Sequence, residues 1–328
     1  MYKVGIVGVG KLGNFHCNAL SQLAAAELVG VYDLVADRSR EIAEKYRCMA
    51  FDSYDQLIAA SDVLGIIVPT SHHLQFARAA LRAQKPIFVE KPITSTVTEA
   101  EEMVELARQQ RVPIQVGHIE RFNPAIRALD GRELRPRFIE SHRLAPFDPR
   151  GTDVAVVLDL MIHDIDIILS LVKDDVTCID ANGVAVVSDE VDIANARIQF
   201  KNGAVANVTA SRISQRKMRK MRLFQRDSYI SIDFLQKLTE VFQIVDPSED
   251  FPNTVVLGQI EKGTKKRHIV YDQPPISTQD AMQSEWLSFF AALEQNSQPL
   301  VSGEDGLKAL VVAQKITEIV NSSKSDFE

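Results

Sequence analysis

Three groups of residues in this 328-residue sequence have types and spacings that could do chemistry. The first is the glycine triplet Gly8, Gly10 and Gly13 in the stretch VGIVGVGKLG. Between a strand and a helix, the first glycine permits a tight turn, the second lets the backbone approach a pyrophosphate, and the third lets helix and strand pack closely. Asp33, at the end of the next predicted strand, can hydrogen-bond the hydroxyls of an adenosine ribose. This pattern predicts a dinucleotide site.

The same pattern bears on which dinucleotide is bound. A carboxylate at Asp33 would repel a 2′-phosphate, which favours NAD over NADP, although Arg38 and Arg40 just downstream weaken that preference. Lys11 and Leu12 lie in the glycine turn, where the following helix offers free N–H groups and partial positive charge to phosphates. A structural turn without a ligand is the alternative, and the combination of strand, helix and acid argues against it.

The second and third groups could move a proton. Lys91, in FVEKPITST, ends a predicted strand at the carboxyl edge of the sheet and can donate a hydrogen bond to a substrate hydroxyl. Alone, it is more simply a solvated loop charge. Asp159 and His163 are spaced i and i+4 on a predicted helix, so the carboxylate can orient the imidazole, which can take a proton from a secondary alcohol. The alternative is an amphipathic helix whose polar side faces water, but polar residues in so apolar a segment are costly unless they pair or line a wet cavity.

Short apolar runs alternate with helical patterns up to about residue 120, which predicts βαβ units and a parallel sheet. We expect strands at 2–9, 26–33, 63–70, 86–92 and 113–118, and helices at 12–23, 38–46, 53–61, 73–83 and 96–110. Longer strands follow at 137–144, 178–188, 192–213 and 221–234, with helices at 156–172, 278–294 and 303–320. KNGA at 201–204 predicts a hairpin with a type I′ turn. The predicted fold is α/β: a Rossmann dinucleotide-binding domain at 1–119, then an α+β domain at 120–328 for substrate binding and oligomerisation, with an open, mostly antiparallel sheet.

Composition excludes several classes of protein. The net charge of −7 argues against a nucleic-acid partner, and the 45% of apolar residues contain no run long enough to insert into a membrane. The first residues read as a strand without a cleavage site, so no signal peptide is expected. Cys17, Cys48 and Cys178 are odd in number and far apart, which fits a cytoplasmic protein and predicts no metal site.

The glycine fingerprint, EKP at 90–92, and an aspartate followed at i+4 by histidine, in this order, resemble the glucose–fructose oxidoreductase and inositol dehydrogenase family (Gfo/Idh/MocA). The likeness covers essentially the whole chain. It implies that a substrate lies between the second sheet and the nicotinamide, that Lys91, Asp159 and His163 form the catalytic group, and that the bond before Pro92 is cis. It also implies that PTSHH at 69–73 is a cofactor loop. The residues that the resemblance adds to the cofactor site are Pro69, Thr70, His73, Glu90 and Lys91. For His72 and His73, a solvent-exposed helix start is the alternative.

GHIERFNPAI at 117–126 and the segment 219–234 resemble a narrower subgroup, the bacterial UDP-N-acetylglucosamine 3-dehydrogenases of lipid A synthesis. Arg121 could pair with a pyrophosphate and Asn123 could hold a sugar hydroxyl, or they are a surface charge and a turn residue. A basic run could attract a nucleotide-sugar diphosphate, or it is a solvated strand edge. Its members are Arg212, Arg216, Lys217, Arg219, Lys220 and Arg222. Trp286 is most simply core packing.

Together with the resemblance, these residues predict an NAD-dependent oxidoreductase that oxidises a secondary hydroxyl of a sugar ring. His163 is expected to accept the hydroxyl proton, and Lys91 to hydrogen-bond the same substrate oxygen. The substrate is expected to be a nucleotide sugar, with a free sugar or inositol as the alternative. A dinucleotide-binding sensor without turnover is the alternative from another class. A homodimer or homotetramer is expected because exposed sheet faces commonly pair.

Overall fold

The computed structural model describes residues 1–147, 155–248, 254–262 and 265–324. The chain divides into two compact units, one of Met1–Phe122 with Gln279–Val311 and one of Asn123–Thr278 with Val312–Glu328. The first division lies close to the predicted boundary at residue 119, but the segment Gln279–Val311 returns to the first unit. The units are therefore not two consecutive halves of the chain.

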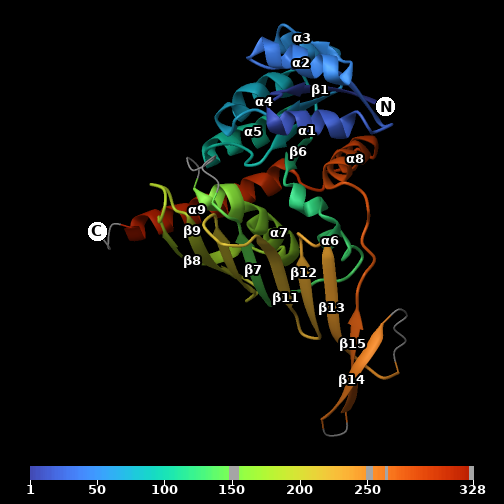
Figure 1. Ribbon diagram of the computed structural model, residues 1–328, viewed down its shortest axis with the longest axis vertical. Helices are drawn as coiled ribbons and strands as arrows, with labels where there is room; N and C mark the ends of the chain where they lie inside the picture. Colours follow the sequence, from blue (N-terminus) through green and yellow to red (C-terminus); the bar gives the residue numbers. More distant parts are fainter. Residues whose placement is uncertain (148–154, 249–253, 263–264, 325–328) are drawn as a thin grey trace. The chain divides into compact units, whose positions relative to one another are not determined.

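Within the described residues, the first unit is built on a six-stranded parallel sheet in the order β3-β2-β1-β4-β5-β6. Figure 1 labels β1 and β6 of this sheet. Its strands are β1 (Tyr2–Val7), β2 (Ala26–Tyr32), β3 (Met49–Ala50), β4 (Val63–Ile66), β5 (Ile87–Glu90) and β6 (Ile114–Gly117). Every residue of β4, β5 and β6 is buried, as expected for strands covered on both faces. The direction of winding reverses between β1 and β4, where doubly wound sheets bind dinucleotides. The Rossmann prediction is confirmed.

Helices cover both faces of this sheet. They are α1 (Lys11–Leu20), α2 (Ala36–Tyr46), α3 (Tyr54–Ala60), the 3-10 turn η1 (Thr70–His72), α4 (His73–Arg82), α5 (Val97–Gln110), the 3-10 turn η2 (Ile119–Phe122) and α8 (Ala281–Glu294). Local sequence fixes where they begin: Ser53 caps α3, and Thr96 and Glu99 form a capping box at α5. Helix α9 (Gly303–Lys324) begins in the first unit and continues into the second.

The core of the first unit depends on α8, which comes from the far end of the sequence. Trp286 is fully buried in one apolar cluster with Val4, Ile6 and Phe88. Its ring stacks on Phe88 with centroids 4.6 Å apart. The expectation of core packing is correct for Trp286, and α8 is an integral part of the Rossmann unit.

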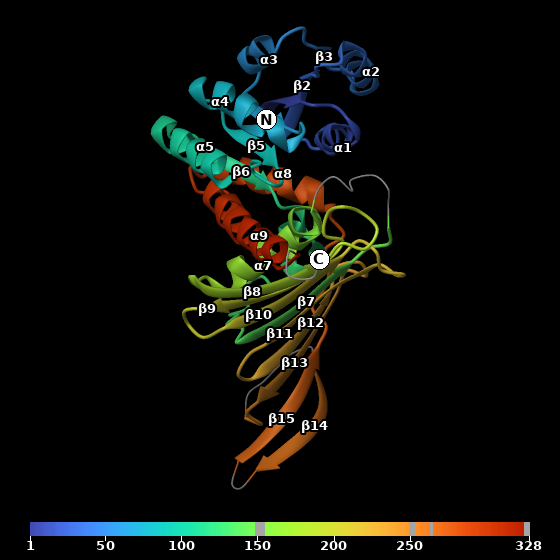
Figure 2. The ribbon, with the colours of Figure 1, turned by 90° about the vertical axis from the view of Figure 1, so that its left-hand side faces the viewer.

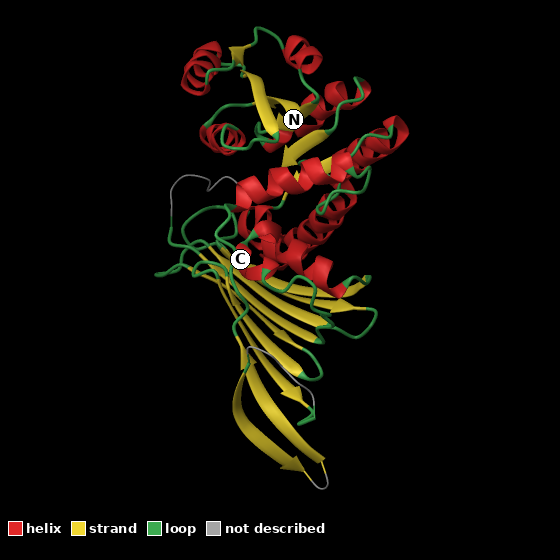
Figure 3. Ribbon diagram, turned by 90° about the vertical axis from the view of Figure 1, so that its right-hand side faces the viewer, coloured by secondary structure: helices red, strands yellow, loops and turns green. Residues whose placement is uncertain are grey.

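The part of the second unit that the structure describes contains a nine-stranded sheet in the order β14-β15-β13-β12-β11-β7-β10-β9-β8. Figure 3 shows its strands in yellow. Only β7 and β10 pair in parallel among these neighbours, so the mostly antiparallel prediction is confirmed. The strands are β7 (Phe138–Leu144), β8 (Val176–Val184), β9 (Ile193–Phe200), β10 (Val205–Ser211), β11 (Met218–Phe224), β12 (Ser228–Asp233), β13 (Leu238–Val245), β14 (Val255–Lys262) and β15 (Lys265–Asp272). The other elements are α6 (Pro124–Arg127), the π-helical turn η3 (Val157–Met161) and α7 (Ile162–Val172).

The two faces of this second sheet differ. Helix α7 packs on β7 and β10, and η3 packs on β10, so one face is covered (Figure 2). On the other face, half-exposed rings from five adjacent strands lie side by side, with centroids 5.1 to 5.6 Å apart. We call these rings the aromatic row: Phe138, Phe224, Tyr229, Phe242 and Tyr271. Direct register pairing of each ring with the next aligns them.

Two predictions about the second sheet are corrected. The hairpin at 201–204 forms between β9 and β10, but only Gly203 has a positive φ, at 81°. A type I′ turn needs positive φ at both central residues; here Gly203 donates to the Phe200 carbonyl, and the turn is a type I turn followed by a left-handed glycine. The basic run also does not lie at a sheet edge, because β11 is hydrogen-bonded to β7 on one side and β12 on the other.

Candidate functional site

The turn from β1 to α1 contains two glycines that the fold requires, Gly8 and Gly13, and one that it does not, Gly10. Gly8 has a φ of +85°, and a Cβ there would lie 2.3 Å from the Ile67 carbonyl oxygen. A Cβ at Gly13 would lie 2.0 Å from the Gly8 carbonyl oxygen. At Gly10, no described atom lies within 4 Å of the Cβ position. Gly10 therefore leaves an open backbone surface at the start of α1, which fits the close approach of a diphosphate.

Asp33 lies at this turn, because β2 carries it to the carboxyl edge of the sheet beside β1. Its Oδ2 accepts a hydrogen bond from the Val9 amide at 2.9 Å, and its Oδ1 accepts one from the Val35 amide at 2.9 Å. The carboxylate is half-exposed, and Arg38 is exposed in the first turn of α2. The acid of the fingerprint thus contacts the glycine turn, as ribose recognition requires.

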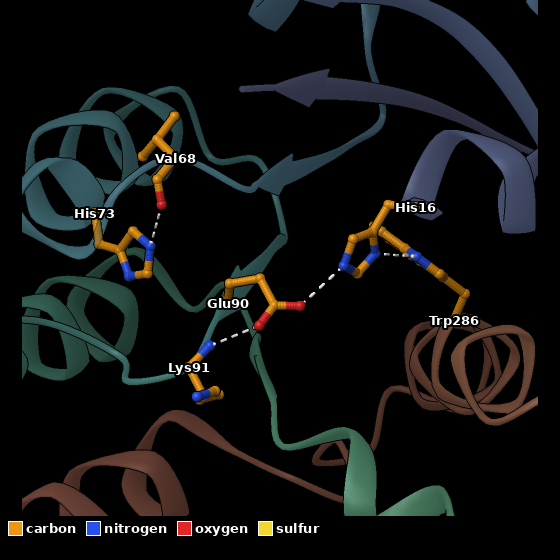
Figure 4. Close-up of polar contacts among 6 residues, drawn as sticks. All are labelled: His16, Val68, His73, Glu90, Lys91 and Trp286. Atoms are coloured by element: carbon orange, nitrogen blue, oxygen red, sulfur yellow. Dashed lines mark hydrogen bonds and ion pairs between the residues drawn. The ribbon is translucent and has the colours of Figure 1, made fainter. Parts of the chain in front are cut away.

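The segment after β5 is held by a chain of buried hydrogen bonds (Figure 4). Trp286 Nε1 lies 3.0 Å from His16 Nδ1, and His16 Nε2 lies 2.9 Å from Glu90 Oε1. Glu90 Oε2 accepts a hydrogen bond from the Lys91 amide at 3.0 Å. Burial alone would raise the pKa of Glu90, but the His16 and Lys91 contacts outweigh it and hold that pKa below its usual value. The Lys91–Pro92 bond is cis, as the resemblance implied.

His73 holds the other end of this segment. Its Nδ1 lies 3.0 Å from the Pro92 oxygen and 3.2 Å from the Ile93 oxygen, and its Nε2 lies 2.9 Å from the Val68 oxygen. The ring is 1% exposed, so the interpretation of His73 as a solvent-exposed helix start is wrong. Burial lowers the pKa of His73. A neutral imidazole has one N–H, so the ring donates either to the Val68 carbonyl or to the Pro92 and Ile93 carbonyls, and it lies between the β4–α4 loop and the segment that carries Lys91. A contact with cofactor stays a prediction.

Pro69 and Thr70 lie in the same β4–α4 loop. Pro69 is exposed and Thr70 is half-exposed, at the carboxyl end of β4 next to the glycine turn in sheet order. Open α/β sheets bind ligands at that edge. Their position is compatible with the predicted cofactor loop.

The described contacts of the residues after β6 hold neighbouring backbone segments in place. Arg121 donates to the Leu300 carbonyl at 2.9 Å. Asn123 caps α6, since its Oδ1 accepts from the Ala125 amide and its Nδ2 donates to the Phe234 carbonyl. These contacts are those of a turn residue and a loop anchor, and the substrate-binding roles stay predictions. His118, at the end of β6, is fully buried; burial, with the nearby cations of Lys91 and Arg121, lowers its pKa to about 3.

In the second unit, Asp159 and His163 lie on one continuous helical segment. Asp159 is inside the π-helical turn η3, and His163 is the second residue of α7. The sequence predicted a regular helix here; an i→i+5 turn inserts one residue, so the ideal i, i+4 geometry does not apply over the whole interval. Turns of this kind are frequent at functional sites.

A buried ion pair fixes this helix to the sheet. Arg143, on β7, donates from Nε and Nη2 to the two oxygens of Asp164 at 3.1 and 2.7 Å. Both side chains are 2% exposed. Asp164 directly follows His163, so the pair anchors the backbone that carries the imidazole. The expectation that polar residues in this segment pair is correct for Asp164.

Comparison with known proteins identifies the class of enzyme. The profile of the oxidoreductase family GFO/IDH/MocA, NAD-binding Rossmann fold, matches residues 2–118, and that of the GFO/IDH/MocA C-terminal domain matches residues 127–229. The UDP-N-acetylglucosamine 3-dehydrogenase of Acidithiobacillus ferrooxidans is 41% identical over 241 residues, which cover 73% of this chain and 76% of that one. The chain belongs to the GFO/IDH/MocA oxidoreductase family.

Two further relatives place it within this family. A solved structure of the UDP-N-acetylglucosamine 3-dehydrogenase GnnA from Acidithiobacillus ferrooxidans superposes with a TM-score of 0.87 at 33% identity and covers 98% of both chains. The scyllo-inositol 2-dehydrogenase (NAD(+)) of Bacillus subtilis is 29% identical over 231 residues, 65% of this chain and 68% of that one. The predicted GFO/IDH/MocA resemblance and the predicted class, an NAD-type oxidoreductase, are confirmed.

The structure brings some of the predicted GFO/IDH/MocA site residues together within the first unit. Gly8, Gly10, Gly13 and Asp33 meet at one turn, and on the same edge of the sheet Glu90 ends β5 and Lys91 follows it. Asp159 and His163 belong to the second unit. Their meeting with Lys91 therefore stays a prediction.

Sequence reasoning missed the side chains that hold this site. His16 lies one α-helical turn after Gly13, and its position on the inner face of α1 was a readable signal. Its partner Trp286 is too distant in sequence for any local pattern to reveal. The described residues hold no cluster of three or more potential metal ligands, and none of the described helices is long and apolar enough to cross a bilayer.

Proposed function

We propose that this enzyme oxidises the 3-hydroxyl of a UDP-N-acetylglucosamine-type nucleotide sugar with NAD. The observation that carries the proposal is one edge of the first sheet, where the open turn at Gly10, the carboxylate of Asp33 and Lys91 all follow carboxyl ends of parallel strands. Ligands of doubly wound sheets bind at that edge. Family membership adds the class of reaction, a hydride transfer.

The residues present fit a dinucleotide. The amides at the start of α1 would hold the pyrophosphate, for which the missing side chain of Gly10 leaves room, and Asp33 would accept hydrogen bonds from the ribose hydroxyls. Arg38 follows Asp33 closely in sequence, so its guanidinium could bind the 2′-phosphate of NADP and weaken the preference for NAD. When bound, the nicotinamide cofactor would supply the hydride acceptor for the oxidation of the carbon that carries the reacting hydroxyl.

Two side chains act on that hydroxyl in the proposal, and a third orients one of them. His163 accepts its proton, and Asp159 orients the imidazole for that transfer. Lys91 donates a hydrogen bond to the same oxygen and stabilises the negative charge that develops on it. Lys91 suits this role because the backbone on both sides of it is fastened by Glu90 and His73.

The choice of substrate rests on the relatives. The 41% identical relative is named for UDP-N-acetylglucosamine, whereas inositol dehydrogenases match at lower identity. A free sugar or inositol is therefore the second candidate. A role in lipid A synthesis belongs to the same proposal, since it depends on the same substrate. Free, unpaired thiols of Cys17, Cys48 and Cys178 support a reducing, cytoplasmic location.

Steady-state assays of NADH formation test the assignment. Wild type is compared on UDP-N-acetylglucosamine, myo-inositol and glucose, and then Lys91→Ala and His163→Ala are assayed on the best substrate. We expect each substitution to lower kcat by about 10²- to 10⁴-fold. Lys201→Ala and His268→Ala, outside the proposed site, are the matched controls. Near-wild-type turnover in both site variants would refute the roles, and cofactor binding without turnover on any sugar would indicate a sensor.

The cofactor preference has its own variant. Asp33→Asn removes the charge that opposes a 2′-phosphate, so we expect kcat/KM for NADP to rise relative to that for NAD. An unchanged ratio of the two kcat/KM values would show that Asp33 does not bind the adenosine ribose.

We propose further that a second copy of the chain covers the aromatic row, giving a homodimer or a homotetramer. The row is continuous, apolar and half-exposed, and such faces are typical of interfaces between copies. Light scattering of Phe242→Lys should show a smaller particle than wild type, while Leu235→Lys, exposed but outside the row, should not. A monomeric wild type would refute this.

A further inference from the structure

We propose that Trp286 fixes the direction of a buried hydrogen-bond chain through His16 and Glu90, and that this chain positions Lys91. The positioning role rests on the proposed function; the direction of the chain does not. The chain lies wholly within the first unit, and its four members come from α1, β5, the segment after β5 and α8 (Figure 4).

The direction follows from what an indole can do. Trp286 Nε1 carries a hydrogen and has no acceptor lone pair, so at 3.0 Å it donates to His16 Nδ1. Nδ1 must then be unprotonated, and the single ring proton of His16 must lie on Nε2. That N–H donates to Glu90 Oε1 at 2.9 Å, and Glu90 Oε2 accepts from the Lys91 amide at 3.0 Å. Every contact in the chain is then a matched donor and acceptor.

Burial makes a mismatch between donors and acceptors in this chain costly. Trp286 and His16 are 0% exposed and Glu90 is 8% exposed, so a mismatched group has little access to water as a substitute partner. Packing also limits rotation of the rings: the Phe88 ring lies 5.1 Å from His16 and 4.6 Å from Trp286, centroid to centroid. Because the imidazole is enclosed, it cannot exchange its two nitrogens to suit a different partner.

The consequence for Lys91 is a backbone fastened on both sides. Glu90 Oε2 accepts from the Lys91 amide, and His73 in its Nδ1–H tautomer donates to the carbonyl oxygens of Pro92 and Ile93. Trp286 and His16 touch neither substrate nor cofactor in this proposal. They are positioning residues, and their effect reaches the reaction through Glu90.

The substitution Glu90→Gln tests the order of donors and acceptors in the chain. The amide is nearly the same shape, but it presents one acceptor and one donor in place of two acceptors. If its oxygen faces Lys91, its NH₂ meets the His16 Nε2–H; if it flips, its NH₂ meets the Lys91 amide. His16 could resolve the first clash by moving its proton to Nδ1, but the Trp286 N–H blocks that tautomer.

Trp286→Phe removes the blocking N–H. In that background His16 can carry its proton on Nδ1 and accept through Nε2 from the NH₂ that Glu90→Gln introduces, so the second substitution should partly cancel the first. The matched control is Phe290→Leu. Phe290 packs on Trp286 with ring centroids 5.7 Å apart and takes no part in the hydrogen-bond chain, so its truncation loosens the same core without freeing His16.

The first measurement is the tautomer of His16, by long-range ¹H–¹⁵N correlation NMR of the imidazole. We expect the Nε2–H form in wild type and the Nδ1–H form in the Glu90→Gln/Trp286→Phe double variant. An Nδ1–H form in wild type would overturn the proposal. This result is independent of any catalytic activity, so it stands even if the proposed function fails.

The second measurement is kcat for the four combinations of Glu90→Gln and Trp286→Phe, with Glu90→Gln/Phe290→Leu as control. We expect Glu90→Gln to lower kcat about tenfold in the wild-type background and less than about threefold beside Trp286→Phe. The control should show no rescue. Equal effects of Glu90→Gln in both backgrounds would overturn the positioning role. If Glu90→Gln alone does not fold, folding of the Trp286→Phe double but not the Phe290→Leu double supports it, and failure of both refutes it.

Discussion

The two units hold their candidate catalytic side chains by different means. In the first unit, Lys91 lies in a loop after a parallel strand, and several hydrogen bonds from Glu90 and His73 fasten that loop. In the second unit, His163 lies on a helix, and one bidentate ion pair between Arg143 and Asp164 anchors the helix to an antiparallel sheet.

The difference follows from backbone chemistry. A loop has backbone groups that no ladder or helix satisfies, so its carbonyls need partners such as the His73 ring. A helix satisfies its own backbone and needs only to be held in place. A loop site therefore depends on many moderate contacts, and a helix site can depend on a single strong one.

The largest effect should come from breaking the buried ion pair between Arg143 and Asp164. Arg143→Met leaves the Asp164 carboxylate buried without its partner, and we expect a loss of about 3–5 kcal/mol in the free energy of unfolding, measured by urea denaturation. Arg143→Met/Asp164→Leu should recover much of the loss, because it removes the orphaned charge.

Arg222 supplies the matched control for that experiment. It contacts Glu140 at 3.4 Å, and its side chain is 49% exposed. Arg222→Met should therefore cost less than about 1 kcal/mol. Similar losses for Arg143→Met and Arg222→Met would show that the buried pair is not what anchors the helix.

The second prediction sharpens the account of the first unit. Gly13→Ala places a methyl group 2.0 Å from the Gly8 carbonyl oxygen, so we expect about 1–3 kcal/mol of destabilisation. Gly10→Ala meets no described atom within 4 Å and should cost about 1 kcal/mol or less, yet weaken NAD binding. Calorimetric titration with NAD and thermal unfolding separate the two. Unchanged NAD affinity in Gly10→Ala would contradict the cofactor site.

The third prediction concerns pH. Because the pKa of His118 falls to about 3 in the fold, the unfolded chain takes up a proton below about pH 6.5 that the folded protein does not. Stability from this group is complete above pH 6.5 and is lost as the pH falls toward 3. At pH 5.5 the loss is about 1.4 kcal/mol. Unfolding of His118→Asn should depend less on pH over that range, and a profile parallel to wild type would be evidence against the buried neutral ring.

The elements of the first unit were readable because their periodicity is strong and local. The five longer strands are short, mostly apolar runs that contain Val or Ile, and Ser53 and Thr96 mark the helix starts. The two-residue strand β3 has no pattern of its own. In the second unit β13, β14 and β15 were missed. Strand β14 lies at the edge of the sheet, and several of its apolar side chains, Val255, Val256 and Leu257 among them, are exposed.

The site residues that belong to a sequence motif could be predicted. The glycines and Asp33 could be assigned roles because a motif fixes both type and spacing. The supporting residues could not: His16 and Trp286 are 270 positions apart, and only the fold brings them to hydrogen-bond distance. The π-helical turn around Asp159 also left no signal, because its residues are as apolar as those of an ordinary buried helix.

The return of α8 to the first unit has a consequence for biosynthesis. Ribosomes release the chain from its N-terminus, so Phe88 and its neighbours emerge long before Trp286 can fill the space they leave. Part of the apolar interior of the nascent Rossmann unit therefore stays uncovered until the intervening segment 123–278 has been made. A fragment ending at residue 122 would carry every glycine of the fingerprint and still lack the indole that completes its centre.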